Sequence, residues 1–221
     1  IVKSVKEGRR IYDNIRKFIR YILTGNTAEI WAIFLAPLMG LPIPLLPVHI
    51  LWINLVTDGL PALSLAAERA EKNIMKRPPR KPEESIFAHG LGVHVLWVGI
   101  LIGLLTVGTQ AYTIHNTDTH WQTIVFTVLC FGQLWHVMAI RSETISLFSI
   151  GIFSNRPLIL TVLATVLLQL AVIYVPYLNG FLHTQPLTIV ELLLAVSASA
   201  VVFVAVEIEK WVKRRMQAKQ N

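Results

Sequence analysis

The sequence contains few of the residues on which soluble domains and disulfide-stabilised folds depend. Only 15% of its 221 residues are charged, whereas a typical soluble domain carries about 25%. Cys130 is the single cysteine, which excludes an internal disulfide and a metal site built from several cysteines. We expect it to act as a small buried hydrophobic residue. Walker, nucleophile-elbow and CxxC motifs are also absent, so none of those catalytic signatures applies.

Hydrophobic sequence is what the chain has in abundance, at 54% of its residues. A helix needs about 20 apolar residues to cross the hydrocarbon core of a bilayer. Stretches of this length lie at about 18–38, 48–67, 90–112, 121–140, 158–177 and 187–208. The sequence therefore predicts an all-α, polytopic membrane protein with six transmembrane helices and the lipid bilayer as its solvent.

The 20 lysine and arginine residues are confined to one side of this topology. They lie before or at the start of the first span, after the second and fourth spans, and after the sixth. The other connections contain none: 39–47, 114–120 and 175–186. The positive-inside rule makes the basic side cytoplasmic and places both termini there. The net charge of +7 is thus an orientation signal, and we expect no nucleic-acid partner.

The first 17 residues differ from the spans that follow. Ile11, Ile15, Phe18 and Ile19 form one helical stripe, and much of the remaining surface is Lys and Arg. No proline or turn cluster separates this segment from the first span. It is predicted to continue that span into the cytosol as a stalk over residues 1–17, the alternative being a helix lying on the membrane surface.

The connection 67–89 is the only sizeable loop on the basic side. Its run KRPPRKP, at 76–82, is stiff and cannot be helical, because each proline restricts its own backbone and the residue before it. The run is interpreted either as a docking surface for a cytosolic domain or as a charge that keeps the loop in the cytosol.

Polar residues interrupt the first two spans at mid-depth. Asn26 and Glu29 are spaced i, i+3, and Asn54, Thr57 and Asp58 are spaced i, i+3, i+4, so each set lies on one helical face. A charge at the centre of a bilayer costs at least ~2.5 kcal/mol and marks ion paths. Interhelical hydrogen bonding is the alternative, but it explains one polar residue better than five. Carboxylate, amide and hydroxyl oxygens suit hard cations, so the sequence predicts a cation site.

Gly59 and Pro61 follow the second polar set directly. Pro61 has no N–H for the carbonyl of Thr57, and its ring clashes with that carbonyl. We predict that the second span is unwound over residues 57–61, which exposes backbone carbonyls as further cation ligands. Irregular backbone at membrane depth is tolerated where it lines a protein cavity, as in the broken helices of transporters.

These residues carry a resemblance to a known family. The run LWINLVTDGLPA at 51–62 resembles the sixth transmembrane helix of P-type Ca²⁺-ATPases. The run GRRIYDNI at 8–15, continuing to Asn26 and Glu29, is similar to their fifth helix and its stalk. The loop run NIMKRPPR at 73–80 is similar too, although relatives often have an aspartate where this chain has Asn73.

The resemblance implies that residues 1–221 are the C-terminal half of the membrane domain of a type II P-type ATPase. Asn26 and Glu29 would be fifth-helix cation ligands, and Asn54, Thr57 and Asp58 sixth-helix ligands. The partners would be the first four membrane helices and the cytosolic domains, which hold ATP, Mg²⁺ and the phosphorylated aspartate. Because those parts lie upstream, we do not expect this chain alone to hydrolyse ATP. The implied function is Ca²⁺ transport out of the cytosol. The short connections on the side without basic residues are compatible with a plasma membrane, which is the expected location.

Gln133 departs from the two-site Ca²⁺ pumps, which carry a glutamate at the matching eighth-helix position. Glutamine offers a carbonyl oxygen without charge, so one Ca²⁺ per cycle is expected. Relatives that handle Na⁺ or K⁺ also use glutamine in that region, which leaves a monovalent pump as one alternative. A scaffold or passive channel descended from a pump is the other, but Glu29 and Asp58 beside a broken helix favour an occluding site.

The third span contains a pair of glycines, Gly99 and Gly103, at GxxxG spacing. Small residues at this spacing let two helices approach closely. We expect the first span to pack there; two unrelated membrane glycines are the alternative. His94 and His136 lie within spans and are expected to be hydrogen-bonded packing residues.

Overall fold

The computed structural model describes residues 1–71, 74–80, 83–88, 90–116 and 120–220, without the side chains of 217–220. Asn73 and the end of the basic loop run, 81–82, lie outside these residues. Every regular element in the described part is helical. The long elements are α1 (Val2–Leu38), α4 (Leu91–Asn116), α5 (Trp121–Ala139), α7 (Arg156–Tyr174) and α9 (Ile189–Gln220). The short ones are α2 (Pro47–Trp52), the π-helix η1 (Ile53–Asp58), α3 (Gly59–Leu65), α6 (Leu147–Ile150), the 3₁₀-helix η2 (Ile152–Ser154) and α8 (Pro176–Leu182).

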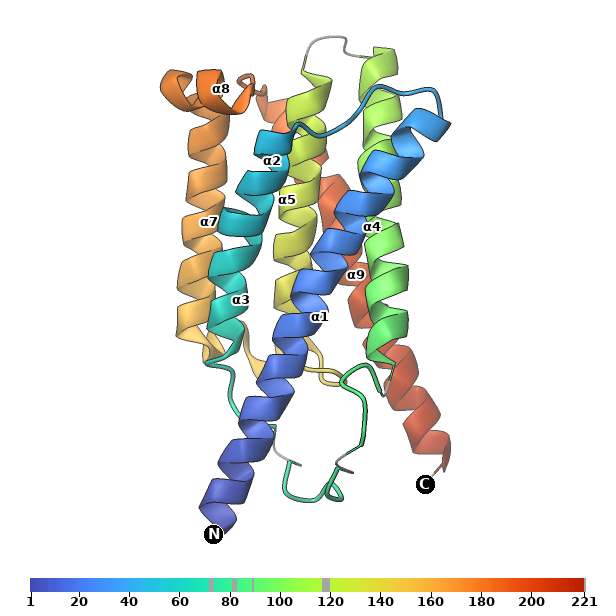
Figure 1. Cartoon of the computed structure of the whole chain (residues 1–221), viewed down its shortest axis with the longest axis vertical. Coiled ribbons are helices and arrows are strands. Elements are labelled where there is room, and N and C mark those ends of the chain that lie inside the picture. The colour runs from blue at the N-terminus through green and yellow to red at the C-terminus, as the bar shows by residue number, and fades with distance from the viewer. Residues whose placement is uncertain (72–73, 81–82, 89, 117–119, 221) are drawn as a thin grey trace.

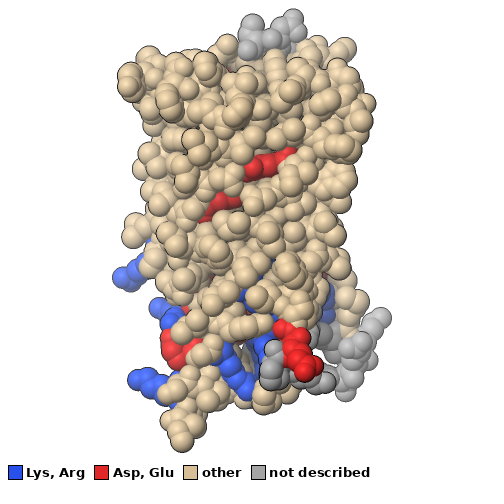
Figure 2. Space-filling model, viewed as in Figure 1, with Lys and Arg blue, Asp and Glu red and all other residues tan. Residues whose placement is uncertain are grey.

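The long helices run roughly along one axis, and α2, η1 and α3 together form one further rod (Figure 1). Both termini and the connection between α3 and α4 lie at one end of the bundle, and α8 crosses the other end. On the face drawn in Figure 2, Lys and Arg are seen only toward the end with the termini. This arrangement agrees with the predicted topology, and the assignment of that end to the cytosol stays a prediction.

Five helical segments are long and apolar enough to cross a membrane: Pro47–Leu65, Leu91–Asn116, Trp121–Ala139, Arg156–Tyr174 and Ile189–Met216. They confirm a polytopic membrane protein and correspond to five of the predicted spans. The predicted first span lies in α1, which is not among them. Its polar residues lower its hydropathy below that of the other spans, so the number six remains a prediction. Helix α1 is nonetheless continuous from Val2 to Leu38, as a stalk requires.

Three predicted span ends differ from the structure by three residues or more. The third predicted span ends at 112, whereas α4 continues to Asn116. The fifth predicted span continues to residue 177, but α7 ends at Tyr174, and Pro176 begins α8. Proline fits the first turn of a helix, where its missing N–H has no intrahelical partner. The sixth predicted span ends at 208, whereas α9 continues to Gln220. Its last turns are rich in Lys and Arg, which favour a helical C-terminus but not a membrane interior.

Helix α5 is the centre of the bundle. Within an 18-residue apolar stretch of each helix, 89% of the residues in Trp121–Ala139 are buried, against 22% in Ile189–Met216. Phe126 and Leu129 of α5 pack with Tyr21 of α1, Ile53 of η1 and Ile102 of α4 in one apolar core. Helices α7 and α9 instead expose large apolar side chains, which suits contact with lipid tails because these are equally apolar. The polar residues of neighbouring helices are therefore brought together around α5.

The glycine pair of α4 packs against α1, as predicted. A Cβ added to Gly99 would lie 2.5 Å from Thr27 Cγ2, and one added to Gly103 would lie 2.8 Å from Trp31 Cβ. Real Cβ atoms essentially never come so close to other heavy atoms. The contact fixes the height of α1 against α4, and with it the depth of Glu29.

We expect Gly99→Ala to destabilise the bundle by about 1–3 kcal/mol, because the added methyl overpacks the α1–α4 contact. Gly92→Ala is the matched control on the same helix, since nothing lies within 4 Å of its added Cβ. The control should be neutral or more stable by up to about 1 kcal/mol, from helix propensity alone. Thermal unfolding in detergent measures both variants, and equal midpoints would contradict the close contact.

At the end with the termini, a buried ion pair joins the segment after α3 to the segment after α5. The Arg141 guanidinium donates to the two Glu68 carboxylate oxygens at 2.9 and 3.1 Å, and to the carbonyls of Gly151 and Ile152. Asn155 Nδ2 donates to the same carboxylate at 3.0 Å. Both charged groups are almost fully buried. Such a satisfied network holds the end of the site-bearing segment in one position.

Candidate cation site

The predicted site residues lie at mid-height of the bundle. Glu29 is 6% exposed on α1, and Thr57 and Asp58 of η1 are fully buried. Figure 2 shows acidic atoms at mid-height within an otherwise uncharged band, well separated from the charges near the termini. An acidic group at this depth is costly unless it has a partner or a function.

The second span is irregular, but the predicted unwinding over 57–61 is wrong. The irregular segment is a wound π-helix, Ile53–Asp58, and α3 begins directly at Gly59. Pro61 therefore lies in the first turn of a new helix, where a missing N–H is tolerated. The carbonyl of Thr57, to which Pro61 has no N–H to donate, accepts a hydrogen bond from Tyr21 Oη at 3.1 Å. Single π-turns of this kind occur frequently at functional sites.

The two polar sets meet between α1 and η1. Asn54 Nδ2 donates to the carboxylate oxygens of Glu29 at 3.2 and 3.4 Å, and to the carbonyl of Ile50 at 2.9 Å. The amide nitrogen is thus fully used, and the amide oxygen of Asn54 remains as a possible ligand. The sequence placed these residues on separate helix faces, and the structure brings the faces together.

Asp58 and Gln133 are buried without hydrogen-bond partners. Both carboxylate oxygens of Asp58 and both amide atoms of Gln133 lack one, and neither residue is exposed. A buried carboxylate without a partner is strongly unfavourable. Such a group suits a binding site in which a cation supplies the missing interaction. Gln133, on α5, faces the same space as Asp58.

Gly25 brings these two side chains together, a role that the sequence did not reveal. A Cβ added to Gly25 would lie 2.6 Å from Asp58 Oδ2 and 3.0 Å from Gln133 Nε2. Only a residue without a side chain leaves this space free. A glycine in mid-helix next to Asn26, one turn before Glu29, was the available signal, because glycine weakens a helix without such a reason.

The remaining predicted residues are less closely involved. Thr57 Oγ1 donates to Cys130 Sγ at 3.6 Å, and Cys130 is buried as predicted. Asn26 is half-buried, and its side chain makes no hydrogen bond within the described part of the chain. No three His, Cys, Asp or Glu residues of that part converge on one point. A cation here would use two carboxylates and neutral oxygens, the donor types that Ca²⁺ prefers.

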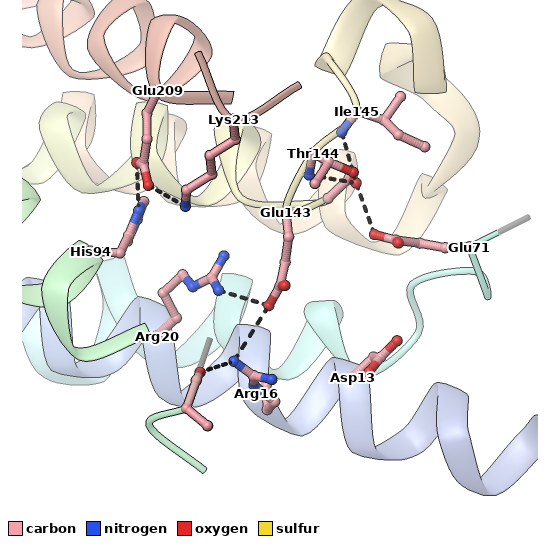
Figure 3. A network of polar contacts seen from close by, with 12 residues as sticks. Asp13, Arg16, Arg20, Glu71, His94, Glu143, Thr144, Ile145, Glu209 and Lys213 are labelled. Carbon is pink, nitrogen blue, oxygen red and sulfur yellow. Dashed lines mark hydrogen bonds and ion pairs between the residues drawn. The ribbon is translucent and has the colours of Figure 1, made fainter. Parts of the chain in front are cut away.

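The two membrane histidines are hydrogen-bonded to each other, as predicted for packing residues. His94 Nε2 lies 3.1 Å from His136 Nε2, and His94 Nδ1 lies 2.7 Å from a carboxylate oxygen of Glu209 (Figure 3). They join α4, α5 and α9 near the end with the termini. Neither residue belongs to the mid-height site.

These features define a class of protein: an α-helical, polytopic membrane protein with two carboxylates and several neutral oxygen donors inside its bundle. Comparison with known families gives a match over residues 42–212 to the C-terminal region of cation-transporting ATPases. The chain belongs to this family.

Several relatives resemble nearly the whole chain. It is 46% identical over 204 residues to a calcium-transporting ATPase of Bacillus subtilis, which covers 91% of this chain and 23% of that protein. It is 40% identical over 232 residues to calcium-transporting ATPase 1 of Bacillus cereus, and the match covers 97% of this chain and 26% of that protein. The human calcium-transporting ATPase type 2C member 1 is 36% identical over 223 residues, with 100% and 24% covered. The chain thus spans about a quarter of the length of these relatives.

Proposed function

We propose that this chain is the cation-translocating membrane part of an ATP-driven P-type pump that moves Ca²⁺ out of the cytosol. The buried Asp58 carboxylate carries the proposal, because its oxygens accept no hydrogen bond of normal geometry and its charge interacts with that of Glu29. Two carboxylates facing one space match the charge of a divalent cation. The names of the relatives, all calcium-transporting ATPases, point to the same ion.

The oxygens available to Ca²⁺ come from three helical segments. Glu29 on α1 and Asp58 on η1 supply the charge. Asn54 and Gln133 supply amide oxygens, and Thr57 supplies a hydroxyl oxygen, with Asn26 completing the set that the resemblance implies. Ca²⁺ prefers oxygen ligands and tolerates irregular geometry, so donors from several helices suit it. The π-helix places Thr57 and Asp58 on the side of the segment that faces the bundle.

The rest of the pump supplies what this chain does not. The first four membrane helices would contribute further ligands, and the cytosolic domains would bind ATP and Mg²⁺ and accept the phosphoryl group. Coupling then requires that phosphorylation change the position of the helices around the site. The ion-pair network of Glu68 and Arg141 holds the segment that follows η1 and α3 and would transmit such a movement. The plasma membrane is the proposed location.

Gln133 limits the charge of the site. A neutral amide beside Asp58 leaves two carboxylates for the whole cluster, which supports one Ca²⁺ per cycle. A monovalent pump is the second candidate, because glutamine also suits Na⁺ or K⁺. A passive module fits less well, since a fully buried carboxylate without hydrogen bonds, that of Asp58, indicates a closed site and not a continuous pore.

The test uses the full-length pump in proteoliposomes. ATP hydrolysis and ion uptake are measured against free Ca²⁺ and, separately, against Na⁺ and K⁺. Half-maximal activation at micromolar Ca²⁺, with one Ca²⁺ taken up per ATP, is the expected result. Activation by Na⁺ or K⁺ alone would replace the proposal with the monovalent pump. Ion flux without ATP hydrolysis would replace it with the passive module.

A further inference from the structure

A polar cavity lies near the chain termini, far from the mid-height site. It has a volume of about 420 Å³, and its lining includes Arg16, Arg77, Arg80, Lys213, Glu143 and Thr144. Figure 3 shows Arg16 and Arg20 of α1 directed at Glu143, with Lys213 of α9 on the far side. The cavity therefore lies between α1, the C-terminal end of α9 and the two connections on this side of the bundle.

Arg16 is the buried cation of this cavity, and part of its guanidinium group has no partner. The residue is 1% exposed. Its Nη2 donates to the carbonyl of Ala88 at 2.7 Å, whereas its Nε and Nη1 make no hydrogen bond. Burial lowers the pKa of Arg16, an effect that the nearby Glu143 opposes. The Nε–H and Nη1–H groups point along different edges of the guanidinium plane, so each can donate singly to an oxyanion.

The acidic residues around the cavity already have partners. Glu143 lies 2.7 Å from Arg20 and only 3.8 Å from Arg16, so one carboxylate faces two guanidinium groups. Burial by itself raises the pKa of Glu143, but the charges of Arg20 and Arg16 outweigh it and leave that pKa below its ordinary value. Glu71 pairs with Arg77, and Glu84 with Arg80. The group that lacks a counterpart is thus a donor, which an anionic ligand would satisfy.

The depth of the cavity points to lipid as the source of that anion. Lys213 lies in the last turn of the candidate span Ile189–Met216, and Arg16 precedes the predicted first span. This is the level of the lipid headgroups, where basic pockets between membrane helices bind anionic headgroups. Ile86 and Phe87, just before Ala88, are 39% and 54% exposed and offer an apolar surface beside the cavity. A lipid could place its phosphate on Arg16 and its chains toward such residues.

We propose that this cavity binds the phosphate of an anionic phospholipid headgroup, with Arg16 as its central donor and Lys213 as a second cation. The interaction ties α1, which carries Glu29, to the end of α9. The proposal is independent of the transported ion, because the two sites share no residue.

The test measures lipid binding to the full-length pump by native mass spectrometry, with phosphatidylglycerol and phosphatidylcholine offered in turn. Wild type is expected to retain phosphatidylglycerol and not phosphatidylcholine. Arg16→Gln should weaken phosphatidylglycerol binding at least about tenfold, or about 1.4 kcal/mol. Arg16→Lys keeps the charge but not the planar donors, so its affinity for phosphatidylglycerol should lie between those of wild type and Arg16→Gln. Arg10→Gln is the matched control, because it removes the same charge from the same helix outside the cavity lining.

Each other outcome is informative. Phosphatidylglycerol binding that is equal in Arg16→Gln, Arg10→Gln and wild type would overturn the site. Millimolar inorganic phosphate that protects the pump against thermal unfolding in phosphatidylcholine, and does so only with Arg16 present, would overturn the lipid source. If Arg16→Gln does not fold, Lys213→Gln tests the same cavity from α9, and undiminished binding there would refute the proposal.

Discussion

Asp58→Asn is expected to weaken Ca²⁺ activation of the full-length pump at least a hundredfold, which corresponds to about 2.8 kcal/mol. Asparagine keeps the size of the side chain but replaces one of two charged oxygens by an amide group. In this bundle Asp58 is fully buried, and neither carboxylate oxygen has a hydrogen-bond partner. The Ca²⁺ ion would be the main electrostatic partner of Asp58, so removing the charge of this side chain should directly lower the affinity for Ca²⁺.

A stability measurement separates this role from a structural one. Ca²⁺ should raise the unfolding temperature of wild type and not that of Asp58→Asn, since a ligand stabilises only the form that binds it. Without Ca²⁺, the variant should unfold at no lower temperature than wild type, because it removes a buried charge that lacks a partner. A carboxylate that held the fold together would give the opposite sign.

Glu191→Gln is the matched control for this substitution. It also neutralises a carboxylate of a membrane helix, but Glu191 is held by local bonds from Thr188 and by His120 at 3.0 Å. Its Ca²⁺ activation should equal that of wild type. Wild-type Ca²⁺ affinity in Asp58→Asn, with one Ca²⁺ still transported, would remove Asp58 from the site and leave the proposed ligand set without its central member.

Gly25→Ala is expected to lower Ca²⁺ affinity at least tenfold, although it adds only one methyl group to a helix. That methyl carbon would lie 2.6 Å from Asp58 Oδ2 and 3.0 Å from Gln133 Nε2. Both side chains must move away from the position they share. Alanine otherwise favours a helix over glycine by about 1 kcal/mol, so the loss of affinity should occur in a protein that still folds.

Gly108→Ala provides the comparison for Gly25→Ala. Gly108 also lies in a membrane helix, α4, and nothing lies within 4 Å of its added Cβ. Titration of Ca²⁺-dependent ATP hydrolysis, together with thermal unfolding, measures both variants. Unchanged affinity in Gly25→Ala would mean that Asp58 and Gln133 do not act from the positions seen here, whichever ion is transported.

The helical segments were predictable because the bilayer requires long apolar runs. The predicted span 121–140 and the helix Trp121–Ala139 differ by one residue. The predicted break in the second span was correct in place to within one turn but wrong in kind. Pro61 indicates that a carbonyl loses its partner, and this local rule can be read from sequence. Whether the segment unwinds or forms a π-helix depends on the helices packed around it.

The sequence by itself determined the apolar spans, the polar face within each helix and the residues that a cation would need, because these follow from local spacing and from the solvent. Only the tertiary structure decided that Asn54 contacts Glu29, that Gly25 faces Asp58 and Gln133, and that Arg16 is buried with free donors. Those facts depend on which helix faces lie against each other. Side chains on different helices meet through packing, and packing is a property of all the contacts in the bundle at once.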